Sequence, residues 1–240
     1  MSWNAPSASA RTPTAEDGGS TRWVEPITLE GRFVRLEPLS EAHFEGLIEV
    51  GVDATLWRWT LSAIATADEL RSYLNAALAA ATAGREVPFA TVERASGRPI
   101  GSTRYLSIDD QHRRLEIGYT WVASAWQRSA VNTEAKLLML RHAFERLGAR
   151  RVEFKTDSLN EQSRRALRGI GATEEGTLRN HMISQGGRAR HSVYFSVIAD
   201  EWPRVRDALE ARLARRSNEL MLNASPACGP SGPDRGCTPS

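Results

Sequence analysis

Cysteine is scarce in this 240-residue sequence, and its scarcity argues against two kinds of chemistry. Both cysteines, Cys228 and Cys237, lie close to the C-terminal end. The rest of the chain therefore offers no thiol for a catalytic nucleophile or for a metal site. The five histidines show no metal-ligand spacing either, so we expect no metal cofactor and no metal-dependent hydrolase. Low cysteine usage also fits a cytoplasmic protein.

Long apolar runs and strong net charge are missing as well. No segment approaches the roughly 18 apolar residues that span a membrane. Residues 1–22 contain no apolar stretch of the kind that a secretory signal needs. The net charge of +2 gives no reason to expect a nucleic-acid partner. Neither G-x-x-x-x-G-K-[ST] nor G-x-G-x-x-G after a strand occurs, which argues against a nucleotide-binding protein.

The composition is that of an ordinary soluble globular protein, with 41% hydrophobic and 25% charged residues. Lysine occurs only at Lys136 and Lys155, so arginine carries nearly all of the positive charge. Residues 1–25 are rich in Ala, Ser, Thr, Pro and Gly and are predicted to be a disordered extension. Residues 217–240 are similar and are predicted to be a disordered tail. One globular domain remains, at residues 26–216.

The most informative stretch runs over residues 114–147. It predicts a strand at 115–122, a turn of small and polar residues at 123–132, and an amphipathic helix at 133–147. The first backbone N–H groups of a helix have no internal partner, and the helix dipole favours negative charge there. Since the side chains of the turn are short, a phosphate can approach the backbone closely. The stretch therefore predicts an anion site.

The remaining elements follow from apolar alternation, helix caps and turn residues. The order is β-α-α-β-β-β-α-β-α-β-β. The further strands are expected at 31–38, 88–94, 99–108, 151–156, 176–184 and 190–198, and the further helices at 43–50, 66–83, 161–170 and 202–215.

Gln127 and the five residues after it resemble the pyrophosphate loop of the GNAT N-acetyltransferases, which has the pattern Q/R-x-x-G-x-G/A. Ala130 and Asn132 stand where that family usually has Gly, and Gly or Ala. Three further blocks, EIGYTWV at 116–122, NTEAK at 132–136 and the run at 155–179, look like the ribosomal-protein-alanine (RimJ/RimL-like) branch. The order of elements is also that of this family. The resemblance implies an α/β (α+β) fold with a mixed, mostly antiparallel sheet flanked by helices.

The resemblance further implies that the protein binds acetyl-CoA. Strands 115–122 and 151–156 would separate to admit the pantetheine arm, which adds to an open strand edge by backbone hydrogen bonds. Asn160, in the pattern N-x-x-S with Ser163, is either a plain helix cap or a cap that also touches the coenzyme. The expected contacts with the arm and the pyrophosphate are Thr120, Trp121, Val122, Gln127, Arg128, Ser129, Ala130, Val131, Asn132 and Thr133.

The implied reaction is acetyl transfer from the thioester to a primary amine, on a protein N-terminus or a small molecule. Without a cysteine in the core to carry the acetyl group, direct transfer in a ternary complex is expected. Glu116 is the first candidate for the base that takes the amine's proton; otherwise it is a strand charge paired with Arg104 or Arg114. His181 is a second candidate base or a structural histidine. Ser163 is a candidate proton donor to the departing thiolate, or a first-turn helix serine.

Trp57 and Trp59 share one side only if their segment is extended. Together with His181 they form the predicted acceptor pocket, and the alternative is that they pack between helices. The final hairpin and the terminal helix are the candidate surfaces for a homodimer. A non-catalytic acyl-CoA-binding sensor or scaffold of the same fold is the alternative function, since Ala130 and Asn132 depart from the loop pattern.

Overall fold

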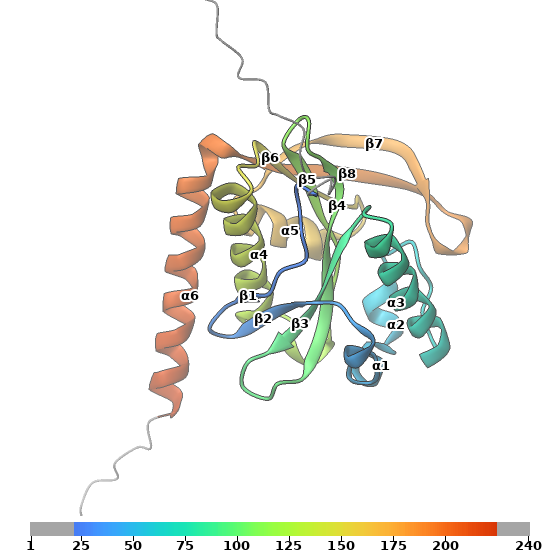
Figure 1. Ribbon diagram of the computed structural model, residues 1–240, viewed down its shortest axis with the longest axis horizontal. Helices are drawn as coiled ribbons and strands as arrows, with labels where there is room; N and C mark the ends of the chain where they lie inside the picture. Colours follow the sequence, from blue (N-terminus) through green and yellow to red (C-terminus); the bar gives the residue numbers. More distant parts are fainter. Residues whose placement is uncertain (1–21, 225–240) are drawn as a thin grey trace, which may run out of the picture.

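The computed structural model describes residues 22–224, which build a mixed sheet with helices on both faces (Figure 1). Within these residues the sheet contains eight strands in the order β1-β2-β3-β4-β5-β6-β8-β7. All neighbours pair antiparallel except β5 and β6, which pair parallel. The predicted fold class is confirmed. The strands are β1 (Leu29–Glu30), β2 (Val34–Pro38), β3 (Val87–Glu93), β4 (Pro99–Asp109), β5 (Arg114–Val122), β6 (Arg151–Asp157), β7 (Thr173–Ile183) and β8 (Ala189–Ile198).

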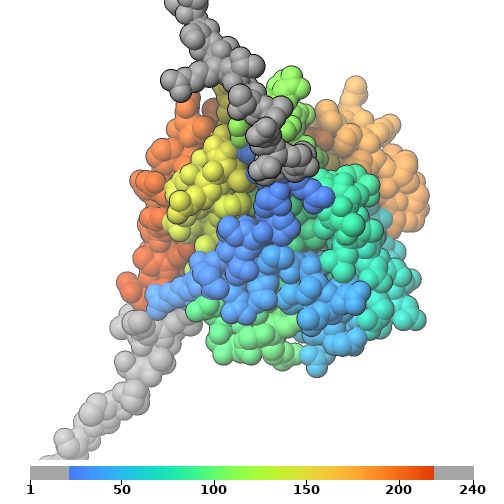
Figure 2. All heavy atoms as spheres, viewed as in Figure 1, coloured from blue at the N-terminus to red at the C-terminus, as the bar shows by residue number. Residues whose placement is uncertain are grey.

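The helices divide between the two faces of the sheet. The helices α4 (Val131–Arg141) and α6 (Trp202–Ala224) cover one face, where Met139 and Leu209 belong to the larger hydrophobic core (Figure 1). The helices α1 (Phe44–Gly51), α2 (Ala54–Trp57) and α3 (Ala67–Thr82) cover the other, around Leu47 and Leu74. The helix α5 (Glu161–Gly169) connects β6 to β7. Figure 2 shows β1, β2 and α1, in blue, filling the space between α4 and α3.

Several boundaries differ from those expected. The helix predicted at 133–147 begins two residues earlier, as α4, and finishes with a π-helical turn at His142–Arg146. The terminal helix α6 continues to Ala224, so residues 217–224 are helical although the sequence assigned them to a disordered tail. Residues 1–21 and 225–240, with both cysteines, lie outside the described residues. No helix within 22–224 has the length and apolar character needed to cross a bilayer.

A buried carboxylate on α4 fixes the turn between β1 and β2. The two carboxylate oxygens of Glu134 accept hydrogen bonds from the backbone N–H groups of Arg32, Phe33 and Val34, at 2.6 to 2.8 Å. Gly31 lies so close that a Cβ there would stand 2.5 Å from Glu134 Oε2. Three charge-assisted bonds offset the cost of burying this carboxylate. Glu134 therefore joins the edge of the sheet to the helix that begins at the predicted anion site.

We predict that Glu134→Gln lowers the free energy of unfolding by about 1 to 3 kcal/mol, measured by urea denaturation. The amide removes the charge and presents an NH₂ group to backbone donors that need an acceptor. Glu49→Gln is the control, because the ion pair of Glu49 with Arg98 is exposed and its loss should change stability by less than about 1 kcal/mol. Equal stability of Glu134→Gln and wild type would contradict this account.

Candidate active site

The sheet opens between its two parallel strands. Pairing of β5 with β6 covers only residues 114–116 and 151–153, although β5 continues to Val122 and β6 to Asp157. Tyr119 and Thr120 are exposed, the tyrosine by 41%, despite belonging to a strand in the middle of the sheet. This exposure follows because the edge of β5 that faces β6 has lost its neighbour. The backbone of Thr120, Trp121 and Val122, the expected contacts with the pantetheine arm, lies along this gap.

A β-bulge accounts for the separation of the two strands. Where β5 pairs with β4, the register shifts by one residue between the pairs Ser102–Trp121 and Arg104–Gly118. Two residues of β5, Tyr119 and Thr120, therefore stand opposite the single residue Thr103. Tyr119 adopts a φ of +48°, in the left-handed region. An extra residue bends its strand and strengthens its twist, which turns β5 away from β6.

The predicted phosphate loop connects this bend to α4. A short 3₁₀ turn at Ser124–Trp126 follows β5, and Ser129 Oγ accepts the N–H of Val131 at 3.2 Å. Among the described residues, the N–H groups of Asn132 and Thr133 have no protein partner. Two free donors at the positive end of a helix dipole are the features that bind an anion.

The departures from the family's loop pattern have a structural explanation. Ala130 has a φ of −69°, which any L-amino acid adopts, and Asn132 already lies in the first turn of α4. The left-handed residue in this loop is Arg128, with a φ of +60°. Neither Ala130 nor Asn132 therefore needs the conformational freedom of glycine.

Gln127 holds the loop in place. Its Nε2 donates to the carbonyl oxygen of Val122 at 3.2 Å, and its Oε1 accepts from Gln162 Nε2 at the same distance. Gln162 belongs to the first turn of α5, so this contact places α5 beside the loop. Asn160 caps the same helix, because its Oδ1 accepts the N–H of Ser163 at 3.0 Å. The predicted N-x-x-S pair thus lies near the loop, in a capping geometry.

Glu116 occupies the opposite face of the sheet from α4. Its side chain is 5% exposed, and Lys155 Nζ of β6 donates to it at 3.3 Å. Burial raises the pKa of Glu116 above its usual value, and the nearby Lys155 partly opposes this shift. The arginines that the sequence offered as partners are occupied elsewhere, Arg104 with Glu86 and Arg114 with Asp109.

His181, the second candidate base, lies on the same face. Its Nδ1 is 3.0 Å from Ser192 Oγ, and its ring lies 5.8 Å from that of Tyr194. Lys155 Nζ lies 5.7 Å from the centre of the Tyr194 ring. Burial lowers the pKa of His181, and the charges of Lys155 and Arg190 lower it further. Both candidate bases therefore belong to one polar row across β5, β6, β8 and β7.

Sequence reasoning missed Lys155 and Tyr194 as members of this row. Each stands at an alternating strand position that carries no motif, and only the pairing of Lys155 with Tyr194 across β6 and β8 brings them together. Alternation within β6 and β8 was the available signal. It could give the face on which each residue lies but not its neighbour across the sheet.

The two tryptophans of the predicted acceptor pocket do not share one side. Trp57 ends the helix α2, is 2% exposed, and packs against the rings of Tyr73 and Trp121 at 5.1 and 5.4 Å. It is a core residue. Trp59 remains half-buried, with the guanidinium groups of Arg58 and Arg188 over its ring. The extended geometry that would align both rings is absent because the segment is helical up to Trp57.

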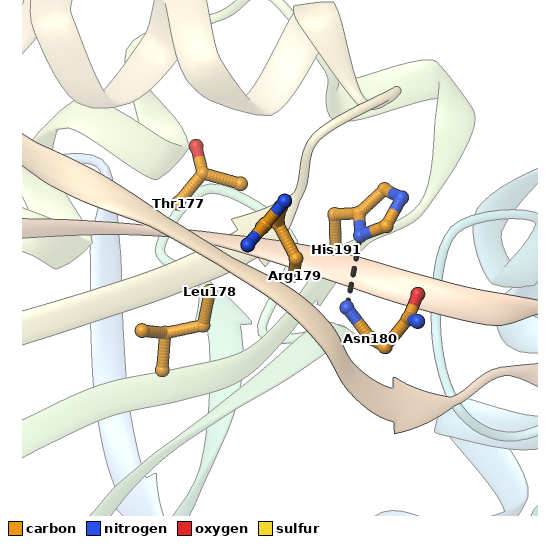
Figure 3. A pocket seen from close by; sticks show the side chains of 5 residues that line it. All are labelled: Thr177, Leu178, Arg179, Asn180 and His191. Atoms are coloured by element: carbon orange, nitrogen blue, oxygen red, sulfur yellow. Dashed lines mark hydrogen bonds between the residues drawn. The ribbon is translucent and has the colours of Figure 1, made fainter.

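A separate open depression of about 670 Å³ lies along β7 and β8 (Figure 3). It contains none of the predicted pocket residues. Asn180 has a φ of +51°, and its N–H donates to His191 Nδ1 at 2.9 Å. The lining residues are Thr177, Leu178, Arg179, Asn180 and His191.

Comparisons with known proteins agree with this geometry. A family model described as the acetyltransferase (GNAT) domain matches residues 34–173, more than half of the chain. YdaF of Bacillus subtilis (strain 168), named provisionally as a ribosomal N-acetyltransferase, is 34% identical over 97 residues, which are 40% of this chain and 51% of YdaF. The chain thus spans about half the length of this curated relative.

Solved structures share the fold. A GCN5-related N-acetyltransferase from Brucella melitensis is 32% identical, with a TM-score of 0.75 over 80% of this chain and 87% of that chain. RimJ of Mycobacterium smegmatis, solved in complex with CoA-disulfide, is 24% identical, with a TM-score of 0.67 over 80% of this chain and 96% of that chain. YdaF supports the resemblance to the RimJ/RimL-like branch, and the RimJ structure agrees with it in fold. The family match, the sheet and the gap beside the loop lead to one conclusion: the chain belongs to the GNAT family of N-acetyltransferases.

Proposed function

We propose that this acetyltransferase moves an acetyl group from acetyl-CoA directly to a primary amine while both substrates are bound. The observation that carries the proposal is the gap between β5 and β6, which ends beside the two free N–H groups of α4. The phosphates would bind at Asn132 and Thr133, and the pantetheine arm would extend β5 along its open edge. The thioester would then lie in the gap between the two faces of the sheet.

The amine would approach from the face that carries Glu116. An ammonium group is not a nucleophile, so its proton has to leave before or during attack on the thioester carbonyl. Glu116 is the proposed base, because its raised pKa makes it a better proton acceptor than an ordinary carboxylate. The carbon–nitrogen bond forms, the carbon–sulfur bond breaks, and the thiolate leaves. Ser163, in the first turn of α5 beside the loop, is the proposed proton donor to that thiolate.

The acceptor is proposed by class only. YdaF carries a ribosomal N-acetyltransferase name, which makes the N-terminal amines of ribosomal proteins the first acceptors to test, ahead of small-molecule amines. His181 and the exposed part of Trp59 are the proposed contacts on this face. Gln185 of the β7–β8 turn donates to the carbonyl oxygen of Trp57 at 2.5 Å, which brings the hairpin against the α2 segment. The acceptor would lie between this hairpin and β5.

The first experiment separates an enzyme from a binding module. Calorimetric titration should show micromolar binding of acetyl-CoA and none of ATP, and a thiol-release assay with peptide amines should show turnover. Binding without turnover on any amine would favour the non-catalytic alternative. Absence of acetyl-CoA binding would remove the proposed function altogether.

Glu116→Gln should lower kcat by about 10²- to 10⁴-fold while the affinity for acetyl-CoA stays unchanged, because only proton removal is lost. The matched variant is His181→Gln on the same polar row, which should keep most of kcat and raise the KM for the amine, because His181 is a proposed acceptor contact. Thiol release under saturating donor measures both. If His181→Gln loses turnover and Glu116→Gln keeps it, His181 is the base instead.

The pH dependence of the rate should report on Lys155. A base works when deprotonated, so the rate rises with pH through the pKa of Glu116, which burial raises and Lys155 holds down. Lys155→Met removes the opposing charge and should move this rise to higher pH. Lys155→Arg keeps the charge and should leave the rise near its wild-type position. Profiles of kcat/KM that coincide for all three proteins would disprove the link between Lys155 and the base.

Asn160 offers a test of coenzyme contact that is independent of folding. Asn160→Ala should cost about 1 kcal/mol of stability through loss of the helix cap, whereas Asn160→Ser keeps a capping oxygen. If the amide also touches the coenzyme, both variants should bind acetyl-CoA more weakly. Wild-type affinity in Asn160→Ser would assign Asn160 to capping alone. Thermal unfolding and calorimetric titration provide the two measurements.

A further inference from the structure

Lys136 is a buried amine at the gap, and nothing in the proposed reaction uses it. It lies on α4 and is 5% exposed, and its Nζ donates to Thr120 Oγ1 of β5 at 2.8 Å. The same Nζ is 5.8 Å from the centre of the Phe154 ring on β6. The amine therefore contacts both strands that border the gap, from the side of α4.

Burial of Lys136 disfavours the charged form of its amine. Burial alone lowers the pKa of Lys136 to about 7. A long apolar side chain would fill the same space without that penalty. A polar group kept in such a place needs a reason in binding or in local geometry.

A chain of hydrogen bonds connects Lys136 to Met139 through the hydroxyl groups of Thr120 and Thr103. Thr103 Oγ1 lies 3.7 Å from Met139 Sδ and 2.7 Å from Thr120 Oγ1; when Thr103 donates to the sulfur, the bond between the two threonines uses the hydroxyl hydrogen of Thr120. Thr120 Oγ1 is then left to accept from Lys136. Lys136 and Met139 lie three residues apart on α4, on one side of the helix. Lys136 therefore contacts Thr120, and Met139 contacts Thr103.

These two threonines lie at the β-bulge between β4 and β5. Thr103 is the residue of β4 that faces the extra residue of β5, and Thr120 is one of the two β5 residues opposite it. The hydroxyl chain thus connects α4 to the point at which β5 turns away from β6. Trp121 and Val122, whose backbone borders the gap, follow at once in the chain.

We propose that Lys136 is a positioning residue for the acyl donor. Through Thr120 and Thr103 it holds the bulge of β5 in the shape that keeps the backbone of β5 at the gap open to the amide groups of a thioester arm. This role rests on the proposed function, because it assumes that the gap takes the donor.

Lys136 is separated by the sheet from the proposed base. Phe154 and Lys155 are neighbours on β6 and so point to opposite faces, the first toward Lys136 and the second toward Glu116. A change at Lys136 should therefore alter binding of the donor. It should leave the affinity for the amine and the rise of rate with pH as they are.

The test combines Lys136→Met with Thr120→Val and their double variant. Each single variant should raise the Kd and the KM for acetyl-CoA by about tenfold, the worth of about one hydrogen bond. The double variant should be no weaker than either single one, because both remove the same link. Thr120→Ser keeps the hydroxyl that accepts from Lys136 and should recover most of the donor affinity that Thr120→Val loses. The KM for the amine should not change in any of them.

Thermal unfolding of the same variants separates positioning from mere structure. Lys136→Met should be as stable as wild type or more so, because an apolar chain replaces a buried amine. Lower donor affinity in a variant of undiminished stability supports the proposal. Wild-type donor affinity in Lys136→Met, or strictly additive losses in the double variant, would overturn it while leaving the proposed function intact. Failure of the wild-type protein to bind acetyl-CoA would instead overturn the proposed function.

Discussion

The early separation of β5 from β6 is the constraint on which the rest of this structure depends. A parallel pair that continued to Val122 would close the sheet and leave no room beside the N-terminus of α4. The separation comes from one extra residue in β5, opposite Thr103, and from the left-handed backbone of Tyr119. The exposure of Tyr119 and Thr120 in a central strand is the direct consequence. The loop, the helix dipole and the candidate base are useful only because this opening lies between them.

The sheet also divides the charged groups into two sets. On the side of α4, Lys136 faces the threonine pair and Glu134 binds the β1–β2 turn. On the other side, Glu116 and Lys155 begin the polar row that ends at His181. The first set would shape the donor site, and the second would handle the proton of the acceptor. Because the sheet lies between Glu116 and Lys136, the buried lysine of α4 does not lower the pKa of Glu116, which burial raises.

Local signals in the sequence predicted much of the fold. Thr66 and Glu69 form the capping box that begins α3, with both reciprocal bonds present, and Asn160 caps α5 as its position suggested. The turn after β5 and the helix that follows were placed to within two residues. These features depend on residues only three or four positions apart, so they can be inferred from one sequence without knowledge of the fold. The contacts of the coenzyme and the roles of Glu116, Ser163 and His181 stay predictions.

Features that depend on distant parts of the chain were not predictable in the same way. Nothing near Glu134 indicates that its partners are the N–H groups of residues 32–34, about a hundred positions away. Trp57 was offered for a pocket because aromatic rings line such sites, yet α3 and β5 bury it. Parallel pairing of β5 with β6 places Glu153 opposite Glu116, and Lys155, two residues further along the same face of β6, proved to be the partner of Glu116. Such contacts are set by the sheet and cannot be inferred from spacing.

Hydrogen–deuterium exchange with and without acetyl-CoA tests the central claim most directly. If the gap holds the donor, exchange should slow at the amides of residues 120–122 and at Asn132 and Thr133, and ATP should have no such effect. Slower exchange confined to another surface, such as the depression along β7, with these amides unchanged by bound acetyl-CoA, would contradict the account.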